Sequence, residues 1–307
     1  DQYVIGQEVL KKRISMTVYH YLLGREQKPI LIIGDTGSGK NHSILVLKQF
    51  LKKEKIDIPV LIFDVSHLTP NGYEGDSVDT ILQEVKRLQT LSGTKKGIVY
   101  MDEFCKLIQP NHDSHGENTN GITQGQLLSM LSGDVRCGVD TSKLLFILGG
   151  AFADLRELRK NKKRHRILGF GQDGESGKEK ITIRDELIEI GIQRELLGRI
   201  SSIVQMDTLG REAIREILVH KEIGPLTRKK AEYQQDQLEL RIDEDMIDRI
   251  VDNVVKEKLG ARSAFNIVED LCGDYNFDMI EQGYSWIKLH SGMLEGEPPV
   301  FGRSGDE

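Results

Sequence analysis

Five short apolar runs, each followed by a segment with helical spacing, restrict the fold of this chain most strongly. Continuous apolar strands are buried on both faces, and such strands alternate with helices in mostly parallel sheets that helices cover on both sides. We therefore predict an α/β fold with a parallel five-stranded sheet flanked by helices. The five runs are ILII (30–33), VLIFD (60–64), IVYM (98–101), LLFIL (144–148) and IVQM (203–206).

Apolar residues at helical spacing predict one helix before the first strand and further helices between the strands. We expect these helices at residues 7–23, 40–53, 77–91, 122–132 and 184–198. The strand pattern ends near Leu209. Beyond it, amphipathic helices are predicted at 211–221, 243–258 and 261–282, with one short strand at 286–289.

The change of pattern near Leu209 predicts two domains and a tail. Residues 292–307 are rich in Gly, Pro and acidic side chains, which is typical of a flexible chain end. We therefore divide the chain into a large α/β domain (1–208), a small, mostly helical domain (209–291) and a flexible tail (292–307).

Charge and cysteine usage limit the classes of function. With 42 basic and 48 acidic residues, the net charge of −6 gives no general attraction to nucleic acid or to a membrane surface. The three cysteines form no CxxC pair, which disfavours a zinc site or a disulfide framework and fits a reducing, cytoplasmic location. No apolar run approaches the roughly 20 residues that span a bilayer. The sequence starts at Asp1 and not at a methionine, so we expect residues before it.

The stretch GDTGSGK (34–40) lies between the first apolar run and a helical pattern, which is the context of a phosphate-binding loop. Its glycines let successive backbone N–H groups converge on phosphate oxygens, and the lysine and the helix N-terminus add positive charge. A glycine-rich turn without a ligand is the alternative, which this context disfavours. We predict that the nucleotide-binding residues are Asp35, Thr36, Gly37, Ser38, Gly39, Lys40, Asn41 and His42.

Two acids follow the third apolar run directly, at Asp102 and Glu103. Asp102 is placed to hold a magnesium ion, directly or through water, and Glu103 to orient and polarise the attacking water. An apolar run that ends in Asp-Glu is common by itself. Together with the phosphate loop upstream, it predicts a site for ATP hydrolysis with ATP and Mg²⁺ as cofactors.

Asn41 stands where such loops carry Ser or Thr, whose hydroxyl would ligate magnesium. An amide oxygen is also acceptable to a hard cation, but it lies one bond further out, and magnesium demands near-ideal octahedral geometry. We expect nucleotide binding to survive, and the replacement puts magnesium affinity and the hydrolysis rate in question. A local hydrogen bond of Asn41, with water at the coordination position, is the alternative that the sequence leaves open.

Motifs along nearly the whole chain resemble the ATPase module of the ClpX family, the AAA+ unfoldases that feed the ClpP protease; the HslU group is less similar. The resemblance implies an AAA+ P-loop fold whose large domain binds nucleotide and whose small domain forms a lid. It also implies an ATP-dependent unfoldase that threads protein substrates through a homo-hexameric pore, into a ClpP-like protease. The matching stretches are YVIGQEVLKK (3–12), GDTGSGK (34–40), GYEG (72–75), GIVYMDEFCKL (97–107), GQLLSML (125–131), DTSKLLFILGGAFADL (140–155), ILGFG (167–171), GIQRELLGRI (191–200) and GARSAFNIVED (260–270).

The resemblance also implies roles for individual residues outside the phosphate loop. Val4 and Ile5 would line the adenine pocket; from the residues alone they read as a hydrophobic entry to the first helix. Arg199 would be an arginine finger that reaches a neighbouring subunit's nucleotide and stabilises the charge of the transition state. Arg262 would contact phosphate from the small domain and couple nucleotide state to the angle between the domains. Without the resemblance, both arginines read as surface cations.

Two further segments gain a role from the same resemblance. Tyr73 would be the gripping side chain of the pore loop, where Glu74 replaces a valine of the family. Six Glu74 carboxylates near the axis of a ring would disfavour acidic segments, unless the side chain points sideways into solvent. The apolar residues Leu168, Gly169 and Phe170 resemble the loop that docks on ClpP, with a loop folded back on its own domain as the alternative.

The chain also departs from the family pattern. The family's zinc-binding domain is absent from this sequence, the entrance loop is short at GDVRCGVD (133–140), and the strand FILGG (146–150) ends without a polar side chain. Asn41, Glu74 and the short entrance loop indicate a specialised or weakened relative. The leading hypothesis is an ATP-driven unfoldase. The alternatives are a nucleotide-binding, weakly hydrolysing regulatory ring subunit and a DNA-directed AAA+ motor, which the acidic balance disfavours.

Overall fold

The computed structural model describes residues 3–25, 28–70, 75–167, 181–257, 260–273 and 275–305, without the side chains of 163–167. The chain divides into two compact units. The large unit comprises Glu8–Asp35 and Lys40–Met206, and the small unit comprises Asp1–Gln7, Thr36–Gly39 and Asp207–Glu307. The phosphate-loop residues Thr36–Gly39 are therefore grouped with the small unit.

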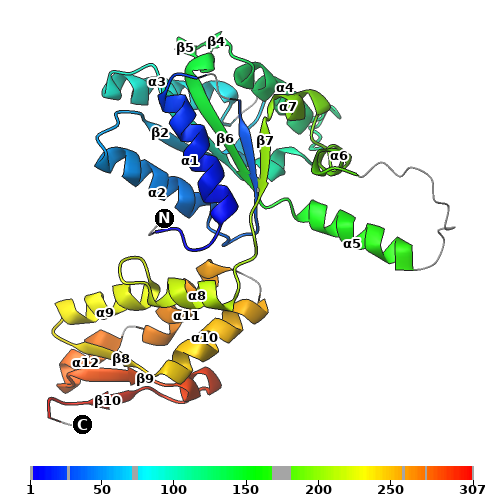
Figure 1. The fold of residues 1–307 in the computed structure, drawn as a ribbon. Helices are drawn as coiled ribbons and strands as arrows, with labels where there is room; N and C mark the ends of the chain where they lie inside the picture. The colour runs from blue at the N-terminus through cyan, green and yellow to red at the C-terminus, as the bar shows by residue number, and fades with distance from the viewer. Residues whose placement is uncertain are drawn as a thin grey trace. The chain divides into compact units, whose positions relative to one another are not determined.

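A five-stranded, all-parallel sheet forms the centre of the large unit, which confirms the predicted fold class (Figure 1). Its order is β2-β3-β6-β1-β7, so that β6 lies between β3 and β1. The five strands fall on the five apolar runs of the sequence. They are β1 (Ile30–Ile33), β2 (Val60–Asp64), β3 (Gly97–Asp102), β6 (Leu144–Gly150) and β7 (Ser202–Gln205).

Both faces of this sheet are buried, which explains why its strands are apolar without interruption. Successive side chains of a strand point to opposite faces. Leu31, Val99 and Phe146 therefore belong to a core with α3 (Val78–Ser92) and α4 (Thr119–Leu131). Their neighbours in sequence, Ile30, Ile98 and Leu145, belong to a second core with α1 (Glu8–Leu22) and α2 (Lys40–Lys53) (Figure 1).

The helix predicted over 184–198 is two helices, α6 (Ile183–Glu189) and α7 (Arg194–Arg199). The chain turns between them at Gly191, whose φ of 116° is in a region that favours glycine. A Cβ there would also lie 2.8 Å from the carbonyl oxygen of Ile108. Helix α5 (Ala153–Ile167) was not predicted, because its many charged residues hide any apolar periodicity.

Short elements complete the large unit. They are the 3₁₀ turns η1 (Val65–His67), η2 (Phe104–Leu107) and η3 (Thr141–Lys143), and the hairpin of β4 (Val135–Arg136) and β5 (Val139–Asp140). Among the described residues, no helix has the length and apolar character needed to cross a bilayer.

The small unit packs five helices around its own apolar core and adds a three-stranded sheet of order β10-β9-β8. The helix predicted over 261–282 is interrupted at Gly273, which adopts φ 49°. The strand predicted at 286–289 is present as β9. The elements are α8 (Arg211–Val219), α9 (Pro225–Gln235), β8 (Glu239–Ile242), α10 (Glu244–Glu257), α11 (Ala261–Cys272), α12 (Tyr275–Gln282), β9 (Trp286–Leu289), η4 (Ser291–Glu295) and β10 (Val300–Gly302).

The chain end differs from the flexible tail predicted over 292–307. Strand β10 pairs antiparallel with β9, and the Phe301 ring stacks on Tyr284 with a centroid distance of 5.3 Å. Tyr275 meets the same phenylalanine edge-on at 5.8 Å. Packing of the half-buried Phe301 against two tyrosines stabilises a segment whose Gly and Pro content is otherwise typical of disorder.

Candidate nucleotide-binding site

Within the large unit, the first and last residues of the phosphate loop, Gly34 and Lys40, lie at the sheet edge that carries the two acids. The loop follows β1, and Asp102 ends β3, with β6 between these two strands. Carboxyl ends of parallel strands meet at one edge, which is where ligands bind in open α/β sheets. Gly37 and Gly39 have φ values of 76° and 98°, a conformation that glycine adopts without steric cost and that turns backbone N–H groups toward an anion.

Lys40 is the first residue of α2 and is 8% exposed. Its ammonium donates to the carbonyl oxygens of Gly34, at 2.5 Å, and of Asp35, at 3.1 Å. Burial lowers the pKa of Lys40, and the carboxylates of Asp102 and Glu103 oppose that shift. The loop therefore holds a buried cation whose hydrogen-bond partners are the loop's own carbonyl oxygens.

The remaining predicted residues of the loop differ in exposure. Thr36 is exposed, Ser38 is buried and His42 is half-buried. The carboxylate of Asp35 forms an ion pair of 2.8 Å with Arg156 in α5. No local pattern predicts this ion pair, because its partners are far apart in the chain.

Asn41 and Asp102 are in direct contact, together with Tyr100 of the same strand. The Asn41 amide donates to Asp102 Oδ2 at 2.5 Å. The Tyr100 hydroxyl lies 2.9 Å from Asn41 Oδ1 and 3.1 Å from Asp102 Oδ1. The local hydrogen bond of Asn41 that the sequence left open is therefore present.

In the sequence, Tyr100 has only the pattern of an apolar strand residue. The contact of its hydroxyl with Asn41 and Asp102 depends on a glycine in the neighbouring strand. A Cβ at Gly149 would lie 2.2 Å from the Tyr100 hydroxyl oxygen. The glycine therefore leaves the space that lets the hydroxyl reach Asn41 and Asp102. The end of β6 has no polar side chain of its own, and the Tyr100 hydroxyl of β3 lies next to it.

Glu103 leaves the strand in the left-handed region, with φ 55° and ψ 29°, and starts η2. This conformation is uncommon for a residue other than glycine and occurs often at functional sites. The Cys105 thiol donates to Glu103 Oε2 over 3.7 Å. The half-buried carboxylate is thus held by its own turn, next to the predicted metal-binding Asp102.

Arg199 is the exposed last residue of α7, and its helix end is fixed by Arg184. The Arg184 guanidinium donates to the carbonyl oxygens of Leu197, at 2.9 Å, and Ile200, at 2.6 Å. The Leu197 carbonyl also accepts from the Ile200 N–H at 3.2 Å, so Arg184 adds a second donor there and provides a donor for the Ile200 carbonyl. Arg184 was missed because nothing in its local sequence indicates a capping role.

Arg199 also lines a pocket of about 530 Å³ in the large unit. Among the described residues that line it there is no acidic side chain. The other basic side chains in the lining are Arg25, Lys28, Lys96 and Lys143. Of these, Lys143 forms an ion pair of 3.3 Å with Asp140, which lies next to the lining.

Gln124 of α4 links the segment behind Glu103 to the start of α7. Its buried amide donates to the carbonyl oxygens of Leu107, at 2.8 Å, and Gly191, at 3.3 Å. Its oxygen accepts a hydrogen bond from the backbone N–H of Gln193 at 3.0 Å. The buried Gln124 side chain therefore connects the turn after Glu103 to the helix that carries Arg199.

The N-terminal segment of the small unit is fixed by Gln7. This side chain donates to the Asp207 carbonyl at 2.7 Å and accepts from the Asp207 N–H at 3.1 Å. Val4 is 8% exposed and Ile5 is half-buried. The sequence did not single out Gln7, because its partner lies 200 residues away.

The start of α11 approaches the phosphate loop within the small unit. The Ala261 N–H donates to the Gly37 carbonyl at 3.1 Å. The exposed Arg262 follows directly in the same helix. Tyr73 and Glu74, and the docking residues Leu168, Gly169 and Phe170, lie outside the described residues.

In this parallel sheet, one strand separates the strand before the phosphate loop from the strand that ends in the two acids, and a small helical unit follows in the chain. This arrangement defines a P-loop ATPase of the AAA+ class. Curated relatives specify the family. The proteins named "ATP-dependent Clp protease ATP-binding subunit ClpX" from Treponema denticola and Borrelia duttonii are 30% and 28% identical; each alignment covers 91% of this chain, and 75% and 72% of those proteins. The "ClpX 2" subunit from Wolinella succinogenes is 29% identical over 96% of this chain and 80% of that protein. This chain belongs to the ClpX family of AAA+ ATPases. No family model matches the sequence.

Proposed function

We propose that this chain binds ATP on the loop of residues 34–40 and hydrolyses it to unfold proteins. The observation that carries the proposal is the position of Lys40 and Asn41, at the end of the phosphate loop, beside Asp102 and Glu103 within the large unit. The relatives' names, which describe ATP-binding subunits of an ATP-dependent protease, support it.

Each proposed role is carried by a group of the chain itself. Backbone N–H groups of the loop and the Lys40 ammonium bind the phosphates. Glu103 accepts the proton of the attacking water and orients it. Arg199 of an adjacent subunit stabilises the charge that develops on the transferred phosphoryl group, and Arg262 senses the phosphates from α11.

Magnesium was predicted at Asn41 and Asp102, and the donor set suits it poorly. The Asp102 carboxylate is an appropriate ligand, but the group that faces it is the Asn41 amide N–H, which donates and cannot ligate a cation.

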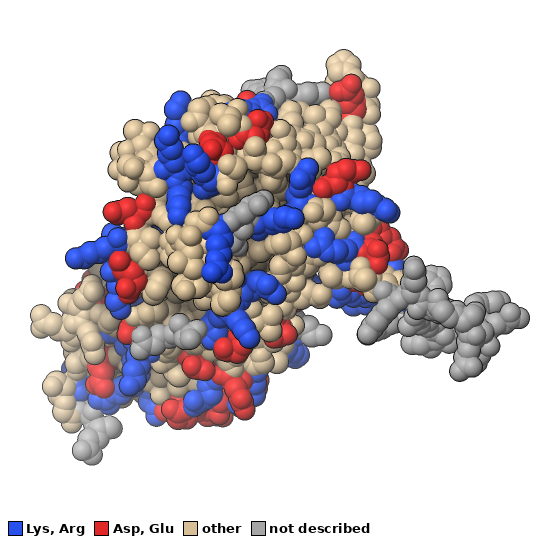
Figure 2. Space-filling model, turned by 45° about the horizontal axis from the view of Figure 1, so that its top comes forward, with Lys and Arg blue, Asp and Glu red and all other residues tan. Residues whose placement is uncertain are grey.

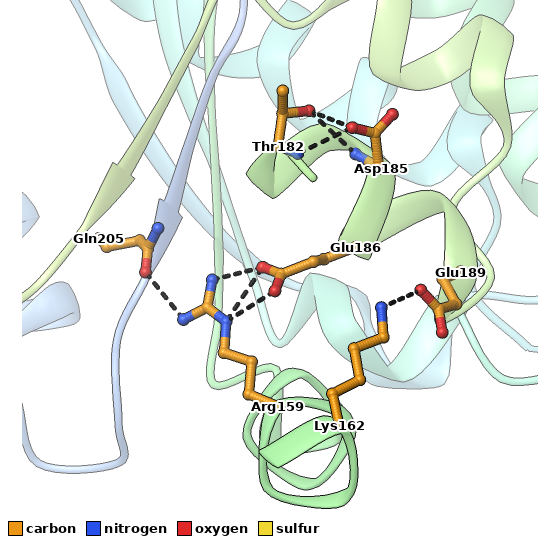
Figure 3. A network of polar contacts seen from close by, with 7 residues as sticks. All are labelled: Arg159, Lys162, Thr182, Asp185, Glu186, Glu189 and Gln205. Carbon is orange, nitrogen blue, oxygen red and sulfur yellow. Dashed lines mark hydrogen bonds and ion pairs between the residues drawn. The ribbon is translucent and has the colours of Figure 1, made fainter. Parts of the chain in front are cut away.

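We further propose that six copies form a ring in which the Tyr73 loops pull a polypeptide substrate through the pore. Residues Leu168, Gly169 and Phe170 dock on a ClpP-like protease. The anchoring of α5, which ends at Ile167 just before them, supports this role (Figure 3). Arg159 grips the Glu186 carboxylate of α6 with Nε and Nη2, the shortest distance being 2.6 Å, and Lys162 pairs with Glu189 at 2.5 Å.

A second candidate is a ring subunit that binds nucleotide and hydrolyses it slowly. The contact between Asn41 and Asp102 favours it, because it occupies the side chain that the metal would need. No observation favours a DNA-directed motor. On the face of the molecule shown in Figure 2, basic and acidic side chains are interspersed.

Phosphate release from ATP, measured against ATP concentration, tests the proposal. We expect turnover in the wild type and a loss of about 10²-fold or more in Glu103→Gln, with binding of a non-hydrolysable analogue retained. Glu54→Gln, on an exposed side chain at the end of α2, is the matched control and should keep wild-type turnover. Equal turnover in Glu103→Gln and the control would exclude Glu103 as the base, and binding without turnover in the wild type would favour the second candidate.

A further inference from the structure

Asn41, Tyr100 and Asp102 form a cluster of polar contacts within the large unit. The Asn41 amide group bridges the other two, because its nitrogen faces Asp102 and its oxygen faces Tyr100. The Tyr100 hydroxyl also lies 3.1 Å from Asp102 Oδ1, and its single proton is shared between these two acceptors. Both carboxylate oxygens of Asp102 therefore have a hydrogen-bonding neighbour from the protein.

The orientation of the Asn41 amide follows from the chemistry of its neighbours. An ionised carboxylate only accepts hydrogen bonds, so the NH₂ group must face Asp102. The Tyr100 hydroxyl lies 2.9 Å from the amide oxygen and can donate its proton to it, which fits the same orientation. A rotated amide would bring its oxygen against the carboxylate at 2.5 Å, which is repulsive unless a cation lies between them.

A threonine or serine at position 41 would behave differently. Its hydroxyl oxygen can donate a hydrogen bond to Asp102 and still offer a lone pair to a cation. The Asn41 NH₂ group has no lone pair to offer, so a cation must break a charge-assisted hydrogen bond and turn the amide before Asp102 and Asn41 become ligands. Magnesium also tolerates little deviation from octahedral geometry.

We propose that Asn41 takes the place of the cation at Asp102, so that this chain binds ATP with nearly the same affinity with and without magnesium. The inference rests on the proposed ATP site and specifies its dependence on metal. Asn41 acts here as a positioning residue, through Asp102.

Titration of a fluorescent, non-hydrolysable ATP analogue in magnesium buffer and in EDTA tests this inference by affinity. For the wild type, we expect dissociation constants within about threefold of each other in the two buffers. For Asn41→Thr and Asn41→Ser, we expect the dissociation constant in EDTA to be about tenfold or more higher than in magnesium buffer. The reason is that the hydroxyl restores a metal ligand. Asn253→Thr, on an exposed position of α10, is the matched control and should repeat the wild-type ratio.

Each contrary outcome has a distinct meaning. Wild-type binding that weakens tenfold in EDTA would overturn the inference and leave the ATP site standing. Hydroxyl variants that bind and yet stay as insensitive to EDTA as the wild type would show that Asn41 does not set the effect. Absence of binding in both buffers, by wild-type protein with a normal circular dichroism spectrum, would instead remove the ATP site itself.

Discussion

The backbone N–H of Ala261 donates a hydrogen bond of 3.1 Å to the carbonyl oxygen of Gly37. This bond joins the first residue of α11 to the turn of the phosphate loop. It places the loop's geometry partly under the control of the helix that carries Arg262. The contact is possible because Gly260, the residue before the helix, has no side chain to separate the two segments.

Gly260→Ala should therefore impair nucleotide binding. Gly260 adopts φ 68°, and a Cβ there would lie 2.7 Å from the carbonyl carbon and oxygen of Gly37. We expect a loss of about 1–3 kcal/mol of unfolding free energy in the small unit and weaker binding of an ATP analogue. Gly210→Ala is the control, since its φ is −79° and a Cβ would meet nothing within 4 Å. Equal affinity of the two variants would show that the approach of α11 does not shape the loop.

Arg184→Ala should slow ATP turnover, because Arg184 fixes the end of the helix that carries Arg199. Without the guanidinium, the carbonyl groups of Leu197 and Ile200 lose a partner, at a cost of about 1–3 kcal/mol, and the end of α7 loosens. We expect turnover to fall while the affinity for an ATP analogue stays unchanged. The double variant with Arg199→Ala should be no slower than Arg199→Ala alone. Additive losses would mean that Arg184 acts independently of the proposed finger.

Tyr21 should make the large unit lose stability in alkali. Its buried hydroxyl accepts from the Gly97 N–H at 2.7 Å and lies within donor distance of the carbonyl oxygens of Gly97 and Lys143, and burial raises its pKa from 10.0 to about 12. The unfolded chain therefore releases this proton at lower pH than the folded one, so the stabilisation is complete below pH 10 and disappears as the pH rises toward 12.

Urea unfolding of the wild type and Tyr21→Phe across this pH range measures the effect. The variant should be less stable at pH 8 by about 1–3 kcal/mol, because the Gly97 N–H loses its acceptor. Between pH 10 and 12, the free energy of unfolding of the variant should fall by about 2–3 kcal/mol less than that of the wild type. Tyr19→Phe, on the exposed side of α1, should follow the wild-type curve. Parallel curves for the wild type and Tyr21→Phe would contradict the assignment.

Glu74→Val should change which substrates are unfolded. If six Glu74 carboxylates lie near the pore axis, wild-type protein should process a substrate with an acidic tail more slowly than one with a basic tail. The valine variant should reduce this difference. Rates of unfolding of one fluorescent substrate carrying either tail give the comparison, and a ratio that does not change on substitution would discard the idea.

Apolar runs and a glycine-rich loop were sufficient to predict the sheet, because both are local patterns with a direct physical cause. The same reasoning could not find Tyr100, since a buried tyrosine in an apolar strand carries no sign that its hydroxyl reaches Asp102. It could not find Gln7 or Arg184 either, because their partners are backbone groups of other segments. Backbone groups are present in every residue and leave no trace in the sequence.

The composition of two segments, α5 and the end of the chain, led to a wrong expectation of their structure. The charges of α5 conceal a helix that ion pairs to α6 hold in place, as with Arg159 and Glu186. The Gly and Pro content of the last residues conceals a strand whose Phe301 packs between two aromatic rings. In each case a few tertiary contacts outweigh the average propensity of the segment.

Binding of ATP to wild-type protein and to Lys40→Ala, followed by calorimetric titration, tests the central claim most directly. Lys48→Ala, on an exposed position of the same helix, is the control. The account predicts binding to the wild type and the control, and a loss of about tenfold or more in affinity for Lys40→Ala, because the buried ammonium is the main charge facing the phosphates. Equal affinity in all three proteins, or no binding to the folded wild type, would contradict it.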